Sequence, residues 1–169
     1  LWLAVSPTMP ERLRGYDQMV DWYNGFRALL ESAPQQAYEW DIEKHTLSEA
    51  GFQSTLWREL MMGDPLLEVD EEGIPAADNI YLSDRAAFRQ LHRSVLSGGA
   101  GGSIDLRMRT GYGVYRWCRL TLATIYGQDG KPRRAVALLV DIDEEKREAL
   151  MMAKRNERDP LTGLFNGEA

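Results

Sequence analysis

Residues 135–143 read Ala-Val-Ala-Leu-Leu-Val-Asp-Ile-Asp, an apolar run of strand length that closes with two acidic residues. Residues 144–158 follow at once and are rich in Glu, Lys, Arg, Ala and Met, which favour helices. Because no turn residue separates the two patterns, we expect a buried strand that leads directly into an exposed helix. Proline restricts the residue before it and cannot continue a helix, so this helix should end at Pro160.

The strand expected at residues 134–142 is apolar on both faces. Ala137 and Leu139 lie on one face, and Val136, Leu138 and Val140 on the other. In an antiparallel sheet this pattern predicts that both faces are covered. Short helices between residues 53 and 96 can cover one face, which leaves the other for an N-terminal helix or a partner.

Four more strands and one long helix are predicted upstream. Residues 37–43 alternate between apolar and acidic side chains, as in a strand with one buried face, and a short strand at 46–52 completes a hairpin. Residues 104–110 and 114–126 form two further strands, separated by Gly-Tyr-Gly at 111–113. Between the two pairs, residues 84–96 form a helix for which Ser83 is the predicted N-cap.

Several of these stretches resemble PAS domains. The relevant residues are Tyr38-Glu-Trp-Asp-Ile42, the strand pair with Arg107-Met-Arg-Thr110 and Val114-Tyr-Arg-Trp-Cys-Arg119, and the exit Asp141-Ile-Asp143. The resemblance implies an α+β fold: a five-stranded antiparallel sheet of spatial order 2-1-5-4-3 with a helical cluster on one face. An N-terminal amphipathic helix and a C-terminal linker helix would be attached to it.

Residues 159–166, Asp-Pro-Leu-Thr-Gly-Leu-Phe-Asn, resemble the opening of a bacterial GGDEF domain, the catalytic domain of diguanylate cyclases. The chain would then divide into an N-terminal extension with its helix (1–32), a PAS domain (33–143), a linker helix (144–158) and the start of a GGDEF domain (159–169). The resemblance implies that GTP and Mg²⁺ bind beyond Ala169. We therefore expect no catalytic residue within residues 1–169.

An amphipathic helix is predicted after Pro10. Its apolar residues recur at steps of three and four and form one wide stripe: Leu13, Tyr16, Val20, Tyr23, Phe26 and Leu30. The stripe either packs on its own domain or on the same helix of a second subunit, and both arrangements can coexist. The second alternative predicts a homodimer.

Composition excludes several classes of protein. The 169 residues carry a net charge of −6, which argues against a general nucleic-acid surface. No apolar run approaches the ~20 residues that cross a bilayer. The single cysteine, Cys118, rules out an intramolecular disulfide and fits a reducing cytoplasm. Because Cys118 lies within a strand pattern, we expect it to be buried and structural. One Cys and two separated His residues provide no zinc-like cluster.

A small-molecule ligand is one alternative for the interior, and a plain packed core is the other. The candidate pocket residues are Trp40, Trp57, Phe88, His92, Met108 and Trp117. In haem-binding PAS domains a histidine of the long helix ligates iron, so the resemblance implies His92 as the candidate haem ligand. Cys118 does not lie in the helical motif of flavin-binding PAS domains, which argues against flavin photochemistry.

The exit helix is the predicted output element. Ile142, Ala149 and Asn156 fall seven residues apart and permit a short coiled-coil seam, although an ordinary solvated helix gives the same spacing. With Asp141 and Asp143 they form the predicted signal-transfer set. The predicted function is a cytoplasmic sensory domain of a bacterial diguanylate cyclase. A ligand-free dimerisation scaffold, or the input domain of a degenerate cyclase or tandem phosphodiesterase, remains an alternative.

Overall fold

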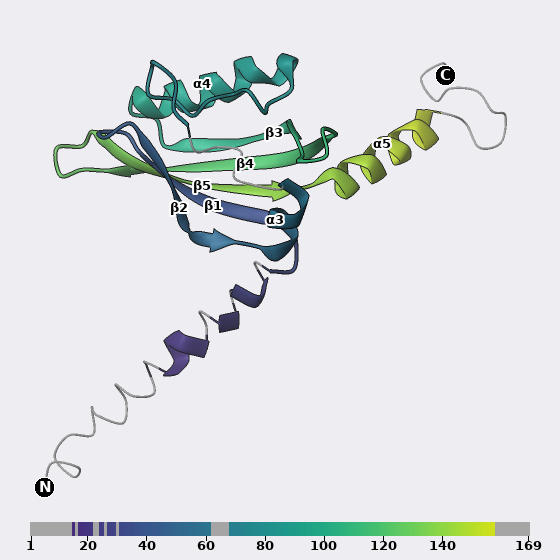
Figure 1. Ribbon diagram of the computed structural model, residues 1–169, viewed down its shortest axis with the longest axis horizontal. Helices are drawn as coiled ribbons and strands as arrows, with labels where there is room; N and C mark the ends of the chain where they lie inside the picture. The colour runs from purple at the N-terminus through teal and green to yellow at the C-terminus, as the bar shows by residue number, and fades with distance from the viewer. Residues whose placement is uncertain are drawn as a thin grey trace, which may run out of the picture.

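The computed structural model describes residues 15, 17–21, 24–25, 27–29, 31–61 and 68–157 of the chain. A five-stranded antiparallel sheet in the order β2-β1-β5-β4-β3 forms its centre (Figure 1). The strands are β1 (Gln35–Asp41), β2 (Thr46–Gln53), β3 (Gly101–Arg109), β4 (Tyr115–Tyr126) and β5 (Pro132–Asp141). The predicted α+β class, the number of strands and their order are confirmed.

The last strand occupies the middle of the sheet. β5 pairs with β1, where Asp41 lies opposite Arg134, and with β4, where Cys118 lies opposite Asp141. A strand between two neighbours has both backbone edges paired, which suits the β-branched and aliphatic residues of β5. The strand that was predicted to lead into the exit helix is therefore also the one that joins the two halves of the sheet.

Helices cover one face of the sheet. They are α3 (Thr55–Met61), the 3₁₀ helix η1 (Leu82–Asp84) and α4 (Arg85–Leu96), and Figure 1 shows α4 lying along β3. The alternating strand residues and the apolar faces of the helices form one core between them: Tyr38, Trp40, Trp57, Met61, Ile74, Ile80, Phe88, Val95, Leu106, Met108, Cys118, Leu120, Leu122 and Leu139. The prediction that Cys118 is buried is confirmed.

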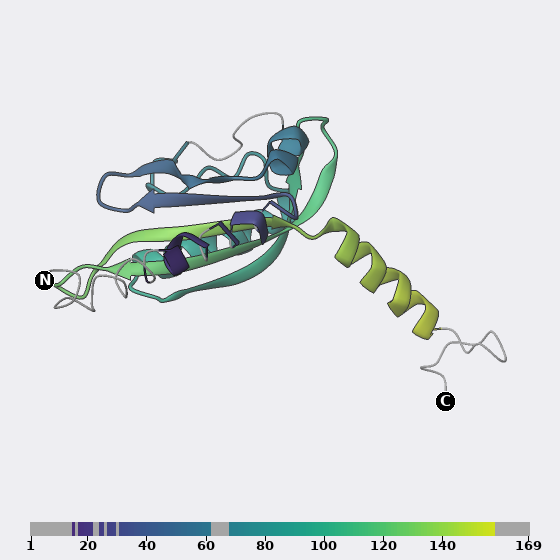
Figure 2. The same ribbon diagram turned by 90° about the horizontal axis from the view of Figure 1, so that it is seen from below.

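The opposite face of the sheet is apolar but less covered. Val136, Leu138 and Val140 of β5 point away from the core, and Val136 is 37% exposed. The described residues do not supply the second cover that the sequence predicted for this strand. The 15-residue helix α5 (Asp143–Glu157) leaves the end of β5 and extends away from the sheet in both views (Figures 1 and 2).

The start of the long helix differs from its prediction. α4 begins at Arg85, after η1, and no side chain caps it. The carboxylate of Asp84 instead accepts hydrogen bonds from the backbone N–H and the guanidinium of Arg107 on β3. The predicted Ser83 N-cap is wrong, because a charged partner on the neighbouring strand holds this end of the helix.

The N-terminal helix is described only in part. The described residues between Gly15 and Leu29 are helical and exposed, among them Met19, Val20 and Leu29. The other predicted stripe residues, Leu13, Tyr16, Tyr23, Phe26 and Leu30, lie outside the described residues, as does the GGDEF-like stretch 159–169. No helix in the described part of the chain is long and apolar enough to cross a membrane.

Candidate functional site

Two places carry the predicted functional residues: the buried layer between the sheet and the helices, and the junction between β5 and α5. In the buried layer, Trp40 of β1 donates from Nε1 to the carbonyl of Gly73 at 2.9 Å. Its ring centroid lies 5.3 Å from that of His92 on α4, and the Phe88 centroid lies 4.4 Å from His92. The imidazole of His92 is therefore enclosed by aromatic rings.

The hydrogen bond of His92 fixes its tautomer. Nδ1 lies 2.8 Å from the backbone carbonyl oxygen of Phe88, which can only accept, so Nδ1 carries the proton and Nε2 carries a lone pair. Burial lowers the pKa of His92 from 6.5 to about 4, against smaller opposing effects of the Phe88 carbonyl and the charge of Asp70. At neutral pH the ring is uncharged.

The free nitrogen of His92 has a defined chemistry. Nε2 is buried and has no hydrogen-bond partner among the described residues. A neutral imidazole whose other nitrogen is held by a carbonyl is suited to accept a hydrogen bond or to ligate a metal. The chemistry of His92 thus fits an axial haem ligand, and haem stays a prediction. No group of three His, Cys, Asp or Glu side chains in the described ranges could hold a metal ion.

Further polar atoms are buried without a hydrogen-bond partner in the described part of the chain, among them the hydroxyl of Tyr38 and Nε1 of Trp57. Burial raises the pKa of Tyr38, which keeps the phenol protonated. Each unpaired buried group costs about 1–3 kcal/mol unless a ligand or an ordered water satisfies it. The core therefore contains an N–H donor, an imidazole acceptor and a hydroxyl whose hydrogen bonds the described residues leave unmade.

The structure separates the six predicted pocket residues into two groups. Trp40, Trp57, Phe88, His92 and Met108 are fully buried on the helical side of the sheet. Trp117 is only half-buried, and it lies on the opposite face because it alternates with the buried Cys118 on β4. Five of the six residues thus belong to one layer and Trp117 belongs elsewhere.

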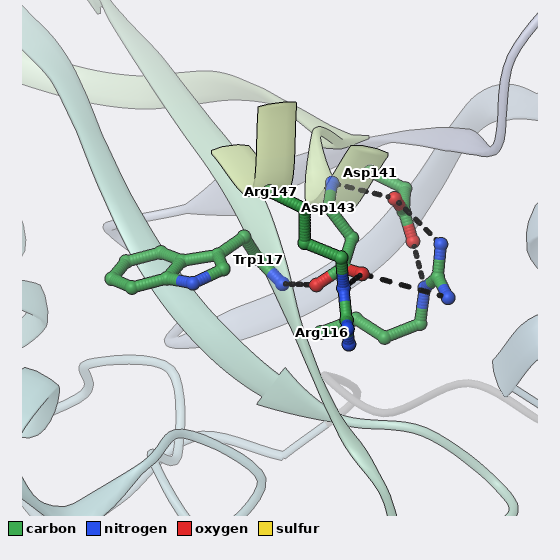
Figure 3. A network of polar contacts seen from close by, with 5 residues as sticks. All are labelled: Arg116, Trp117, Asp141, Asp143 and Arg147. Atoms are coloured by element: carbon green, nitrogen blue, oxygen red, sulfur yellow. Dashed lines mark hydrogen bonds and ion pairs between the residues drawn. The ribbon is translucent and has the colours of Figure 1, made fainter. Parts of the chain in front are cut away.

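The second place is the exit junction, which we define as Arg116, Asp141, Asp143, Arg147 and the backbone N–H of Trp117 (Figure 3). Arg116 donates from Nε to Asp141 at 2.7 Å, and its Nη1 lies 3.8 Å from Asp143. The side chains of Asp141 and Asp143 are each only 5% exposed. The hydrogen bond to Asp141 raises the pKa of Arg116 above its ordinary value.

Asp143 joins the sheet to the first turn of α5. Its Oδ1 accepts from the Trp117 N–H at 3.1 Å, its Oδ2 accepts from Arg147, and its own N–H donates to Asp141 at 3.0 Å. Burial alone would raise the pKa of Asp143, but the Trp117 N–H, Arg147 and Arg116 outweigh it and hold the pKa below 3.8. The ionised carboxylate also suits the positive end of a helix.

The predicted signal-transfer residues also fall into two groups, one at the exit junction and one along α5. Asp141, Ile142 and Asp143 lie at the junction and are at most partly exposed, whereas Ala149 and Asn156 are exposed along α5. Arg116 and Arg147 are two residues of the junction that the sequence did not predict. Arg147 stands four residues after Asp143, a spacing that could have indicated the pair, but the sequence offered no signal that pairs Arg116 with a residue on another strand.

An open groove of about 560 Å³ borders the junction. Arg116, Asp141 and Ile142 line it together with Glu144, Glu145 and Glu148 of α5 and residues 32–34. The Pro34 carbonyl accepts a hydrogen bond from the Asp141 N–H at 2.8 Å, so the chain segment between the N-terminal helix and β1 contacts the end of β5, two residues before α5 begins.

Comparisons with known proteins agree with this geometry. Residues 57–139 match the family model described as the PAS fold. A sensory box histidine kinase/response regulator from Burkholderia thailandensis E264 superposes with a TM-score of 0.54 at 19% identity, covering 77% of this chain and 95% of that one. The N-terminal domain of a diguanylate cyclase with PAS/PAC sensor from Marinobacter aquaeolei superposes with a TM-score of 0.51 at 13% identity, covering 66% and 98%.

At such identities the two structures show the fold alone, and no curated protein matches the chain. The family model, the strand order and the helical cover on one face together identify the fold: this chain has the PAS fold. The PAS resemblance inferred from the sequence is confirmed, whereas the GGDEF domain stays a prediction.

Proposed function

We propose that this chain is the sensory input part of a signalling protein, and that α5 carries its output. The observation that carries the proposal is the exit junction: α5 starts at Asp143, directly after the central strand, and two buried carboxylates tie its first turn to β4. A change in the sheet is therefore passed to the helix at its first residue. Ligands or partners that favour one packing of the sheet would shift the population of α5 positions.

The signal would act in the buried layer. Tyr38, Trp57 and His92 present polar atoms inside an otherwise apolar core, and such groups are usually satisfied by a ligand or by water. The candidate ligand is a small molecule that donates a hydrogen bond to Nε2 of His92. The ligand-free scaffold is the alternative, in which ordered water fills these positions.

For the output we propose cyclic di-GMP synthesis. Its support is the GGDEF-like stretch at 159–166 and the fold shared with the PAS domain named as part of a Marinobacter aquaeolei diguanylate cyclase. Two GGDEF domains must meet to join two GTP molecules, so we propose a homodimer. The exposed Met19, Val20 and Leu29 of the N-terminal helix and the half-covered β5 face are the surfaces that would form it.

Native mass spectrometry of the purified chain tests the input. A dimer with an added small-molecule mass supports the ligand-binding sensor, and a bare dimer supports the scaffold. A bare monomer contradicts the dimer proposal. An absorbance spectrum tests haem: a Soret band that His92→Ala abolishes supports ligation, and a spectrum without the band in the wild-type protein rejects it.

A cyclase assay tests the output. The chain is expressed with its natural downstream sequence, and conversion of GTP to cyclic di-GMP is measured. Asp143→Asn should change the rate because it removes the charge that ties α5 to β4, while Glu144→Gln, the exposed neighbour, should not. Absence of conversion by the wild-type protein would contradict the cyclase proposal.

A further inference from the structure

A second set of contacts holds α5 beyond its first residue. Lys146 of α5 places Nζ 3.0 Å from Oδ2 of Asp105 on β3 and 5.0 Å from the centroid of the Trp117 ring on β4. Arg119 of β4 donates to the other oxygen of Asp105 at 2.9 Å. Asp105 thus binds one cation from the sheet and one from the helix.

The charges around Asp105 favour its ionised form. Burial would raise the pKa of Asp105, but hydrogen bonds from Arg119 and Lys146 hold it below its ordinary value. Arg119 also lies 3.8 Å from Glu145, the residue before Lys146. Two consecutive residues of α5 therefore meet charged partners on the outer face of β3 and β4.

The Trp117 ring connects the contacts of Asp105 and Lys146 to η1, at the start of α4. The guanidinium of Arg107 lies 4.9 Å from the Trp117 centroid and 4.0 Å from that of Tyr81, and it pairs with Asp84 at 2.9 Å. Since Asp84 precedes α4 directly, a continuous line of contacts runs from η1 through Arg107, Trp117 and Lys146 to Asp105.

The contacts of the exit junction are more buried than the contacts around Asp105, and are therefore stronger. The carboxylates of the exit junction are 5% exposed, whereas Asp105, Lys146 and Arg119 are 25%, 32% and 42% exposed. An exposed ion pair changes an equilibrium by only about 1.5- to 5-fold, while breaking a buried pair is far more costly. The outer contacts can therefore open under conditions that leave the junction closed.

β3 is placed to control the outer contacts. It is the last strand of the sheet, and among the described residues its free side is held by an isolated bridge from Ile80 to Met108 and by the hydrogen bond from the Arg107 N–H to Asp84. It also packs against α4. A shift of α4 or η1 can therefore reach Asp105 through β3, which β4 separates from the central strand.

From this arrangement we propose that Asp105, Lys146 and the Trp117 ring form a latch that fixes the direction of α5, while the exit junction acts as its pivot. Displacement of β3 or η1 opens the latch, and α5 then turns about Asp143. The proposal rests on the proposed function in one respect, that α5 carries the output.

Amide hydrogen exchange on the 169-residue protein tests the latch. In Lys146→Gln the amides of residues 147–157 should exchange about 3-fold faster than in the wild-type protein, with α4 and β5 unchanged. The control is Lys154→Gln in the last turn of the same helix. Helix-dipole effects work against the expected result, because loss of a cation favours a helix near its N-terminus and disfavours it near its C-terminus.

The pairing itself is tested by a double-mutant cycle. Asp105→Asn should accelerate exchange in residues 147–157 as Lys146→Gln does, and the double variant should add little more. Equal exchange in Lys146→Gln and Lys154→Gln, or fully additive effects in the double variant, would overturn the latch. In 0.5 M NaCl the difference between the wild-type protein and Lys146→Gln should shrink.

The contacts that connect η1 to α5 through Arg107 and Trp117 are tested separately. Arg107→Gln changes a residue whose charged partner is Asp84, yet exchange in α5 should accelerate; Arg109→Gln, two residues further along β3, is the matched control. Acceleration confined to β3 and η1 would refute this route. If the latch variants alter exchange as expected while the rate of cyclic di-GMP synthesis does not change, the latch stands and the proposal that α5 carries the output fails.

Discussion

Acidification should destabilise this domain through His92. In the folded protein burial keeps the pKa of His92 near 4, whereas the unfolded side chain has its ordinary pKa of 6.5. The unfolded state therefore binds the proton first as the pH falls, and the free energy of unfolding decreases between pH 6.5 and about 4. The pKa difference corresponds to about 3 kcal/mol in full, of which about 2 kcal/mol is lost by pH 5.

The carboxylates with lowered pKa values affect the free energy of unfolding at lower pH than His92 does. Asp84, Asp105 and Asp143 have pKa values held below 3.8, so the stability that they contribute is lost only below that pH. Urea unfolding followed by tryptophan fluorescence at pH 7, 6 and 5, at one fixed protein concentration, therefore isolates the histidine.

His92→Met removes the titrating group and keeps an apolar side chain in the layer, so its stability should be nearly constant from pH 7 to pH 5. His45→Asn is the control, because His45 is exposed and has a positive φ of 52° that asparagine tolerates. It should lose as much stability as the wild-type protein. An equal loss in the wild-type protein and in His92→Met would refute the assignment.

Three further outcomes follow from the described contacts. Asp143→Asn should lower the free energy of unfolding by about 1–3 kcal/mol, since it weakens a buried ionic network. The control Glu144→Gln should change the free energy of unfolding by less than about 0.5 kcal/mol, and thermal or urea unfolding measures both variants. Cys118, which is buried and has a raised pKa, should react with iodoacetamide about 100-fold more slowly in the native state than in urea. Comparable rates in the two states would contradict this and would mean that β4 opens readily. Gly101→Ala should destabilise by about 2 kcal/mol or more, because Gly101 has φ +107° and a Cβ would lie 2.1 Å from the Leu122 carbonyl oxygen; an unchanged urea midpoint would contradict this.

Local alternation was sufficient to predict most of the fold. The pattern at residues 37–43 places Tyr38 and Trp40 on the buried face, and both are buried. The exit helix was predicted at 144–158 and observed at Asp143–Glu157. Strand order cannot be derived from such patterns, because alternation says which face is buried and nothing about which neighbour a strand takes. The order came from the resemblance to PAS domains.

The candidate sites were predicted less completely. Trp117 was grouped with the pocket residues because of its residue type, although its alternation with Cys118 already placed it on the other face. The partners of Asp84 and Asp141 were not foreseen, because they are arginines on strands that only the folded sheet brings near. Ion pairs between distant segments follow from register, and register becomes known only with the pairing of the strands.

The central position of β5 also governs when this domain can fold during synthesis. Arg134 of β5 and Glu39 of β1 are paired across 95 residues of chain, so the two halves of the sheet join only after almost the whole domain has left the ribosome. Non-local pairing of this kind slows folding. Because α5 follows β5 directly, the helix acquires its junction only in the same late step. A nascent chain that fails to close the sheet would carry α5 without the contacts through which Asp143 joins it to β4.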